Sequence, residues 1–151
     1  MVIKSTLPND ATRLADKYVY WLYQKPVDAQ GIPNVGKISS LLHDAKIVWI
    51  RNGEESSLSV EEMVSRLETN YYRNMKSVTL QFCQVFTNDL TPHIETKTVQ
   101  EWDGEDPGSY QINSNIYFKI EVNPETNKLY IAAITQVYTS VLINSCESVL
   151  K

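Results

Sequence analysis

The sequence predicts an α+β fold, in which about three helices from the N-terminal and central parts of the chain pack against an antiparallel β-sheet. Apolar residues recur at three- and four-residue steps before residue 72, which is the spacing of amphipathic helices. After Lys76 they alternate with polar residues, as in strands that bury one face. The 151 residues, with 42% hydrophobic and 21% charged side chains, suit one globular domain. We therefore expect a single domain over 1–151, with its core at about 9–142 and a short polar C-terminal tail.

The first helix is expected over residues 9–24, with Pro26 marking its end. Its apolar face consists of residues at helical spacing: Ala11, Leu14, Ala15, Tyr18 and Leu22. A loop that contains glycine and proline follows at 28–34. A short second helix then begins, and its apolar residues are Val35, Ile38, Leu41 and Leu42.

Residues 45–51 predict a short strand, because the segment is rich in β-branched and aromatic side chains and ends at the turn-forming pair Asn52-Gly53. Ser59 and Glu62 have the spacing of a capping box, in which each side chain accepts a hydrogen bond from the backbone of the other residue. A third helix is therefore expected over 59–70. Its apolar stripe, which we expect to pack on the sheet, comprises Val60, Met63, Val64, Leu67 and Tyr71.

Four long strands are expected in the rest of the chain, at about 78–86, 93–102, 110–122 and 129–142. Cys83 in the first of these is expected to be a small buried hydrophobe. The last strand is apolar on both faces, and soluble monomers seldom leave such a face uncovered. We therefore expect a homodimer or heterodimer that forms through the sheet. The interface candidates are Tyr130, Ala132, Ile134, Tyr138 and Leu142.

The charge balance and the apolar runs exclude several classes of function. The formal net charge is −4 and the pI is about 5.2, so we expect no general attraction to nucleic acid or to anionic membranes. Apolar runs such as 47–50 are far shorter than the roughly 20 residues of a membrane-spanning helix. The N-terminus lacks the long apolar core of a secretion signal, which favours a cytoplasmic or nucleocytoplasmic location.

No motif for a metal or a cofactor is present in the sequence, and none is expected to bind. The two cysteines cannot form a disulfide framework or a metal-binding quartet. His43 and His93 lack the spacing of metal ligands and are interpreted as ordinary surface or helix-end residues. The acidic run at 101–106 lacks the loop spacing of a calcium site and is interpreted as a solvated hairpin tip. The five glycines are too scattered for a phosphate-binding loop.

Three parts of the sequence resemble the nuclear transport factor 2-like superfamily, which includes ketosteroid isomerase and scytalone dehydratase. Residues 17–22 are similar to the first-helix core of the family, and 45–53 with the helix after them to the strand, turn and helix of its transport branch. Residues 117–120 and 129–132 are similar to its closing hairpin. The resemblance covers roughly 9–142. It implies a cone-shaped, cystatin-like fold with a strongly curved antiparallel sheet wrapped around the helices.

The resemblance also implies where chemistry would occur, because enzymes of the superfamily work inside the cone. An isomerase of this kind needs a carboxylate base and hydrogen-bond donors for the developing enolate. Tyr18 is at the position of the first-helix tyrosine donor, but the base position is Trp49 and the second acid position is Ile116. Apolar residues there cannot move protons, so isomerase activity is disfavoured and no catalytic residue is assigned. We also expect neither Asp44 nor Glu121 to turn into the cone.

Two functions from different classes follow from the resemblance. The first is a non-catalytic protein-binding domain that pairs through its sheet, in nucleocytoplasmic transport or as an adaptor, and the apolar base positions favour it. The alternative is a small-molecule enzyme or carrier, of isomerase, dehydratase or cyclase type, that binds an apolar ligand in the cone. The balance between the two leans away from an enzyme. The candidate pocket residues are Tyr18, Trp49, Gln84, Thr98, Ser114 and Thr135.

Overall fold

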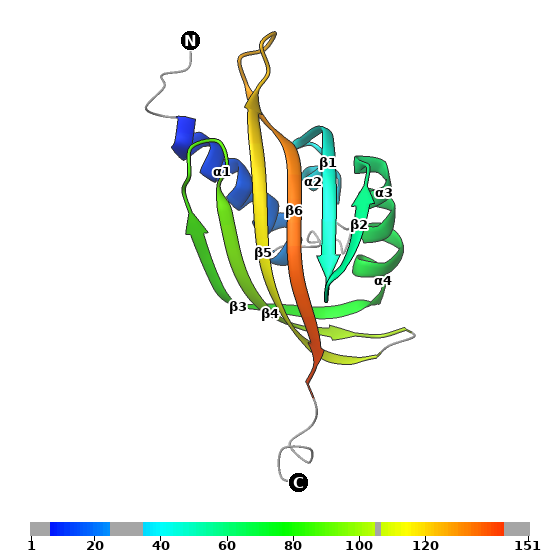
Figure 1. The fold of residues 1–151 in the computed structure, drawn as a ribbon. Coiled ribbons are helices and arrows are strands. Elements are labelled where there is room, and N and C mark those ends of the chain that lie inside the picture. The colour runs from blue at the N-terminus through cyan, green and yellow to red at the C-terminus, as the bar shows by residue number, and fades with distance from the viewer. Residues whose placement is uncertain (1–6, 25–34, 105–106, 144–151) are drawn as a thin grey trace.

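The computed structural model describes residues 7–24, 35–104 and 107–143, which form helices on one side of a curved sheet (Figure 1). The helical segments are α1 (Leu7–Val19), continued by the π-helical turn η2 (Tyr20–Gln24), α2 (Val35–Ser39), α3 (Val60–Arg66), continued by the π-helical turn η3 (Leu67–Tyr71), and α4 (Tyr72–Asn74). The strands are β1 (Leu42–Arg51), β2 (Glu54–Leu58), β3 (Met75–Phe86), β4 (His93–Trp102), β5 (Gly108–Val122) and β6 (Leu129–Leu142). The loop predicted at 28–34 and the tail after residue 143 lie outside the described residues.

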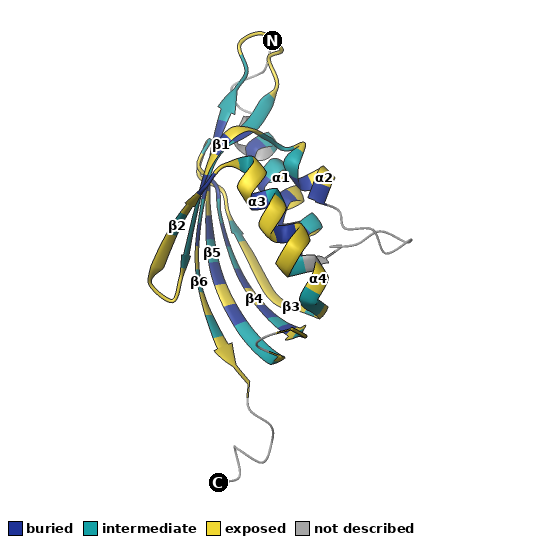
Figure 2. Cartoon of the chain, turned by 90° about the vertical axis from the view of Figure 1, so that its right-hand side faces the viewer, coloured by how far each residue is buried: buried dark blue, intermediate teal, exposed yellow. Residues whose placement is uncertain are grey.

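The sheet has six strands in the order β2-β1-β6-β5-β4-β3. The four long strands are antiparallel to one another, as predicted, since β4 pairs with β3 and β5, and β5 pairs with β6. The helices of the described chain lie against the concave face, and the sheet curves around them (Figure 2). The end strands β2 and β3 do not pair with each other, so the sheet is open. These features confirm the predicted α+β class, with a curved sheet around the helices.

Two features of the sheet differ from the expectation. Strand β1 lies parallel to β6, so the sheet is mixed rather than antiparallel throughout. All the other strands lie between β1 and β6 in the chain, so no hairpin sets their relative direction. Strand β2 is not predicted by the sequence pattern, because most of its residues are polar and exposed. It is placed by the turn before it, in which Asn52 and Gly53 have positive φ angles of 48° and 88°.

The core lies between the helices and the concave face of the sheet. Tyr18 of α1, Met63 of α3 and Leu67 of η3 are at most 4% exposed. The capping box at the start of α3 is formed as predicted: the Glu62 backbone N–H donates to Ser59 Oγ, and the Ser59 backbone N–H donates to Glu62 Oε1, both at 3.1 Å. Other members of the predicted apolar faces are half-buried against this core: Leu14, Leu41, Leu42, Val60, Val64 and Tyr71.

Both α1 and α3 continue into a π-helical turn, and a hydrogen bond links the two turns. In a π turn each N–H bonds one residue further back than in an α-helix, which changes the direction of the side chains that follow. Tyr71 of η3 donates from its hydroxyl to the backbone carbonyl oxygen of Leu22 in η2, at 2.9 Å. Tyr23 of η2 is only 4% exposed and reaches β6. The turns therefore place two tyrosines between the helices and the sheet.

A β-bulge at Ala132 interrupts the alternation of side chains along β6. The register between β5 and β6 shifts between Lys119 and Ile120, and the shift leaves Ala132 without a partner on β5. Ile131 and Ile134 consequently both face the core and are both 0% exposed. The strict alternation predicted over 129–142 is therefore wrong, because the two sides of the strand exchange at the bulge.

The bulge changes the environment of the predicted interface residues. Ile134 is fully buried in the core, so its assignment to an exposed face is wrong. Tyr138 is half-buried on the same inward side as Ile134, Tyr130 and Ala132 are half-buried, and Leu142 is 48% exposed at the end of the strand. For these four residues, contact with another chain stays a prediction.

Cys83 is exposed rather than buried, so the prediction of a buried thiol is wrong. It lies on β3, an edge strand on which most side chains are exposed because no further strand covers its outer edge. Partial burial and the nearby Asp16 carboxylate raise the pKa of the Cys83 thiol.

Candidate functional site

A cleft of about 770 Å³ opens between the concave face of the sheet and the segments η2, η3 and α4. Its size is within the range of about 300–1,000 Å³ that is typical of small-molecule sites. Aliphatic side chains and polar groups contribute to its walls, but aromatic residues are the most prominent. The aromatic lining consists of Tyr18, Tyr23, Trp49, Tyr71, Trp102, Tyr110 and Tyr138.

A buried hydrogen-bond network forms the inner end of the cleft. Gln136 Nε2 donates to the Tyr23 hydroxyl at 2.9 Å and to Ser114 Oγ at 3.4 Å. Burial raises the pKa of Tyr23, and its hydrogen bonds with Ser114 and Gln136 act in the opposite direction. Tyr23 is therefore a neutral phenol at neutral pH. Ser114, a predicted pocket residue, is 1% exposed and lies directly behind the lining residue Gln136.

A second chain of hydrogen bonds follows the inward face of β4. Trp102 Nε1 donates to Gln100 Oε1 at 3.0 Å, and Gln100 Nε2 donates to Thr98 Oγ1 at 3.1 Å. These residues alternate along the strand and therefore share one face. The ring of Tyr71 packs edge-on against Trp102, with centroids 5.8 Å apart. Thr98, another predicted pocket residue, is fully buried behind Gln100.

Tyr18 and Trp49, the two positions to which the resemblance gave chemical roles, both line the cleft. Tyr18 is 1% exposed, its ring meets Phe118 edge-on at 5.5 Å, and its hydroxyl donates to Met63 Sδ at 3.9 Å. Trp49 Nε1 is buried and has no hydrogen-bond acceptor within the described part of the chain. Neither side chain can act as a base, so these positions supply apolar surface and hydrogen-bond donors.

The mouth of the cleft is charged. Arg51 of β1, Glu54 of β2, Arg66 of α3 and Asp103 after β4 line it and are exposed. Tyr138 of β6 lies directly opposite Arg51 in the parallel β1–β6 register. Burial raises the pKa of Tyr138, while the positive charges of Arg51 and Arg66 act in the opposite direction. Arg51, Arg66 and Tyr138 thus line the same cleft.

Two of the predicted pocket residues lie outside the cleft. Gln84 is exposed on the outer face of β3, and Thr135 lines a separate hollow on the outer face of the sheet. Their assignment to the pocket is wrong because bulges reverse the alternation. The register of β3 shifts between Leu80 and Phe82, so Gln84 no longer shares the inward face with Leu80. Thr135 follows the bulge at Ala132, which has the same effect on β6.

The sequence analysis missed several residues that line the cleft, and for one of them the sequence pattern could have predicted this position. Arg51 is two positions after Trp49 in the predicted strand, so alternation alone places the two side chains on one face. Arg66 and Tyr138 have no such signal, because the packing of α3 and the bulge in β6 decide where they point. Glu54 belongs to a strand that the sequence pattern does not predict.

A second hollow, of about 450 Å³, lies on the outer face of the sheet. The His93 ring is stacked between Phe86, at a centroid distance of 5.1 Å, and Tyr117, at 4.3 Å. The side chains of His93 and Asn115 are hydrogen-bonded, with Nε2 and Oδ1 2.9 Å apart. Phe86 and Tyr117 are 39% and 47% exposed. The hollow is therefore bordered by exposed aromatic rings and is separate from the cleft.

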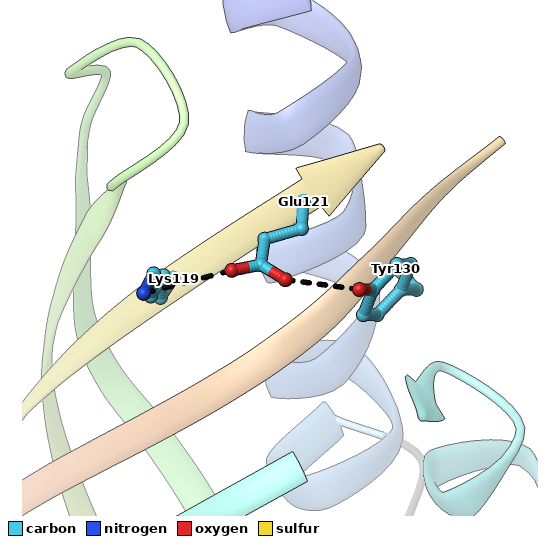
Figure 3. Close-up of polar contacts among 3 residues, drawn as sticks. All are labelled: Lys119, Glu121 and Tyr130. Atoms are coloured by element: carbon cyan, nitrogen blue, oxygen red, sulfur yellow. Dashed lines mark hydrogen bonds and ion pairs between the residues drawn. The ribbon is translucent and has the colours of Figure 1, made fainter. Parts of the chain in front are cut away.

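Glu121 lies outside the cleft, between neighbours on the outer side of the sheet (Figure 3). Its Oε1 accepts a hydrogen bond from the Tyr130 hydroxyl at 2.9 Å, and its Oε2 lies 3.5 Å from Lys119 Nζ. Asp44 is exposed on β1 and does not line the cleft either. As expected, neither carboxylate turns into the cone. The carboxylates that do line the cleft, Glu54 and Asp103, are exposed at its mouth.

Within residues 7–24, 35–104 and 107–143, no group of His, Cys, Asp and Glu side chains is arranged to hold a metal ion. The helices in these ranges are all too short or too polar to cross a membrane. The cleft offers a ligand tyrosine, tryptophan, amide and guanidinium groups as hydrogen-bond donors, and amide, hydroxyl and carboxylate oxygens as acceptors.

Comparison with solved structures identifies the fold. A protein from Shewanella denitrificans described as a SnoaL-like polyketide cyclase superposes with a TM-score of 0.62 at 12% identity, over 85% of this chain and 89% of that chain. An NTF2-like protein from Burkholderia xenovorans gives a TM-score of 0.60 at 7% identity, over 86% of this chain and 89% of that chain. The chain has the nuclear transport factor 2-like fold. A type 2 hexachlorocyclohexane dehydrochlorinase shares this NTF2-like fold, with a TM-score of 0.59 at 9% identity over 93% and 89% of the two chains.

No protein-family model matches the sequence of this NTF2-like chain, and no curated protein matches it either. The prediction of a protein-binding adaptor or transport factor is wrong. The similar structures include proteins named as a polyketide cyclase and a dehydrochlorinase, which favours the alternative of a small-molecule enzyme or carrier. The prediction failed because the lack of one enzyme's base excludes only that enzyme's reaction. It does not close the cleft to other ligands.

Proposed function

We propose that this NTF2-like protein binds a small, largely apolar molecule in the cleft between its helices and its sheet, as an enzyme or a carrier for that molecule. The observation that carries the proposal is the cleft of about 770 Å³, with aromatic walls and a buried polar network at its inner end. Sites of this kind bury most of a ligand's surface and orient it through a few fixed polar groups. The names of the similar structures, a polyketide cyclase and a dehydrochlorinase, support a small-molecule ligand.

The polar groups of the cleft favour a ligand that carries acceptor oxygens. Trp49 Nε1 is buried without an acceptor among the described residues, and a buried unpaired donor costs about 1–3 kcal/mol. A ligand oxygen would remove this cost only after a local shift of the ring, because Nε1 has no accessible surface in the structure. Any base for a reaction would come from Glu54 or Asp103, the carboxylates that line the mouth.

Tryptophan fluorescence tests the proposal directly. The chain has three tryptophans, and two of them, Trp49 and Trp102, line the cleft whereas Trp21 does not. In a Trp21→Phe variant, titration with small aromatic ketones and phenols is expected to change the emission and to reach saturation. The matched control is a Trp49→Phe/Trp102→Phe variant, in which only Trp21 emits and no change is expected.

Native mass spectrometry of the purified protein provides a second measurement, because a ligand retained from the expression host adds its own mass. The absence of any saturable change in the Trp21→Phe variant, together with a native mass that contains no ligand beyond the protein itself, would contradict the proposal. An equal response in the Trp21-only control would also contradict it, since Trp21 lies outside the cleft.

We also propose that the outer face of the sheet pairs with a second copy of this chain. Four large apolar side chains on this face are 37–47% exposed: Phe82, Phe86, Tyr117 and Val137. Apolar patches of this kind on a soluble protein are typical of interaction surfaces. Phe86 and Tyr117 line the outer hollow and none of the four lines the cleft, so pairing would leave the cleft open.

Sedimentation velocity at micromolar concentration is expected to show a dimer. Tyr117→Lys places a charge in the middle of this face and is expected to give a monomer. Tyr20→Lys is the matched control, since Tyr20 is an exposed aromatic residue of similar exposure (39%) on the helical side, and this variant should remain dimeric. A monomeric wild-type protein would refute the pairing.

A further inference from the structure

Two arginines and a tyrosine meet at the mouth of the cleft. The parallel register of β1 and β6 places Arg51 directly opposite Tyr138, and it places Trp49 directly opposite Gln136 one step deeper in the cleft. Arg66 reaches the same mouth from α3, on the opposite wall. The mouth thus carries cationic groups from two elements, and aromatic surface begins immediately below them.

Within the described residues, no carboxylate forms an ion pair with Arg51 or Arg66. Glu54 is opposite Arg51 in the β1–β2 register, but the two side chains do not form an ion pair. Asp103 is on the far wall, where its backbone N–H bonds to the carbonyl oxygen of Asn74. Two guanidinium groups that line one cleft, with no carboxylate ion-paired to either among the described residues, form a favourable place for an anion.

The aromatic surface below the arginines is suited to a flat molecule. Trp102 and Tyr71 are held against each other edge to face on one wall, and Trp49 lies on the sheet below Arg51. Trp49 Nε1 itself is a buried donor with no acceptor among the described residues, so the ring rather than this N–H faces a ligand in the cleft.

We propose that the ligand of the cleft is an aromatic molecule that carries one anionic oxygen group, a carboxylate or its chemical equivalent. Arg51 and Arg66 hold the anionic group at the mouth, with the Tyr138 hydroxyl as a further donor. The aromatic part lies on Trp49 and Trp102. This inference rests on the proposed function, because it specifies the ligand of the same cleft.

A pair of fluorescent probes that differ only in the anionic group tests the inference. 8-Anilinonaphthalene-1-sulfonate carries a sulfonate, and N-phenyl-1-naphthylamine has the same aromatic skeleton without it. Both are titrated into the Trp21→Phe protein, where quenching of Trp49 and Trp102 reports binding, and the arginine and lysine variants below locate the bound probe. The sulfonate probe is expected to bind roughly tenfold more tightly than the neutral probe, since hydrogen bonds to charged groups are the stronger ones. This preference should shrink as salt is added.

Arginine variants assign the preference to residues. Arg51→Gln and Arg66→Gln are each expected to lower the affinity for the sulfonate probe by roughly tenfold and to leave the affinity for the neutral probe unchanged. Both side chains are exposed and lie on different elements, so a folding defect in one variant leaves the other to decide. The matched control is Lys119→Gln, which removes a cation from the outer hollow and should change neither affinity.

The outcomes separate this inference from the proposed function. Equal affinities for the two probes, or unchanged affinity for the sulfonate probe in both arginine variants, overturn the anionic ligand but leave a small-molecule cleft. Loss of sulfonate binding in Lys119→Gln also overturns it, because it places the probe in the outer hollow. No quenching of the cleft tryptophans by either probe overturns the proposed function itself.

Discussion

Gln136 on β6 donates a hydrogen bond of 2.9 Å to the hydroxyl of Tyr23 on η2, although 113 positions separate the two residues in the sequence. This bond joins the first helical segment to the centre of the sheet at the inner end of the cleft. Both side chains are nearly fully buried, so neither has water as an alternative partner.

Tyr23→Phe is therefore expected to lower the free energy of unfolding by about 1–3 kcal/mol, because it leaves a buried amide of Gln136 without its main acceptor. Urea denaturation measures this change. Tyr20→Phe, an exposed neighbour on the same turn, should leave the free energy of unfolding nearly unchanged. Equal effects of the two substitutions would show that the buried bond contributes no stability.

Stability is expected to fall at alkaline pH because burial raises the pKa of Tyr23. An unfolded tyrosine releases its proton near pH 10, whereas the folded protein keeps it to higher pH. The contribution to stability is thus fully present below pH ~10 and is lost as the pH rises through the raised pKa of the folded state.

The slope should reach at most about 1.4 kcal/mol per pH unit for each such group. Tyr138, whose pKa burial also raises, contributes with the same sign. Urea unfolding midpoints measured from about pH 8 to 11 should therefore decline above pH ~10, and less steeply in Tyr23→Phe. If the stability of Tyr23→Phe declined with pH as steeply as that of the wild-type protein, Tyr23 would not be the cause of the decline.

The bulge at Ala132 leads to a prediction about two residues that follow it on β6. Ile134 faces the core and is 0% exposed, so Ile134→Ala should destabilise the protein by about 2–5 kcal/mol. Val137 lies on the outer face and is 37% exposed, so Val137→Ala should change the stability of the monomeric Tyr117→Lys background by less than about 0.5 kcal/mol. Thermal or urea unfolding of both variants in that background measures the two stability losses. A larger loss for Val137→Ala than for Ile134→Ala would contradict the placement of Ile134 in the core and Val137 on the outer face.

The capping box stabilises the start of α3, the helix that carries Arg66 at its other end. Ser59→Ala removes the acceptor of the Glu62 N–H and is expected to cost about 1 kcal/mol of stability. Ser65→Ala, an exposed position inside the same helix, should be neutral or slightly stabilising because alanine is the better helix former. A stability loss in Ser65→Ala that matches Ser59→Ala would show that capping is not the cause.

Local signals in the sequence account for a large part of the fold and some of the site. The capping box at Ser59 and the alternation of β4 each depend on residues close together in the chain, and the structure has both. The resemblance to the superfamily, rather than a local signal, places Tyr18 and Trp49 where the cleft forms. Strict alternation fails at Gln84 and Thr135, because one additional residue in a strand reverses the side of every residue after it.

The sequence by itself determined the classes of the main elements and the apolar faces of the helices, since periodicity and capping act within a few residues. Only the tertiary structure decided the parallel pairing of β1 with β6, the bulges, and the meeting of Arg51, Arg66 and Tyr138 at the cleft mouth. These features arise from contacts between distant segments, in which the curvature of the sheet and the packing of α3 select the register. No local pattern records that selection, because its free energy comes from groups that are neighbours only in the folded chain.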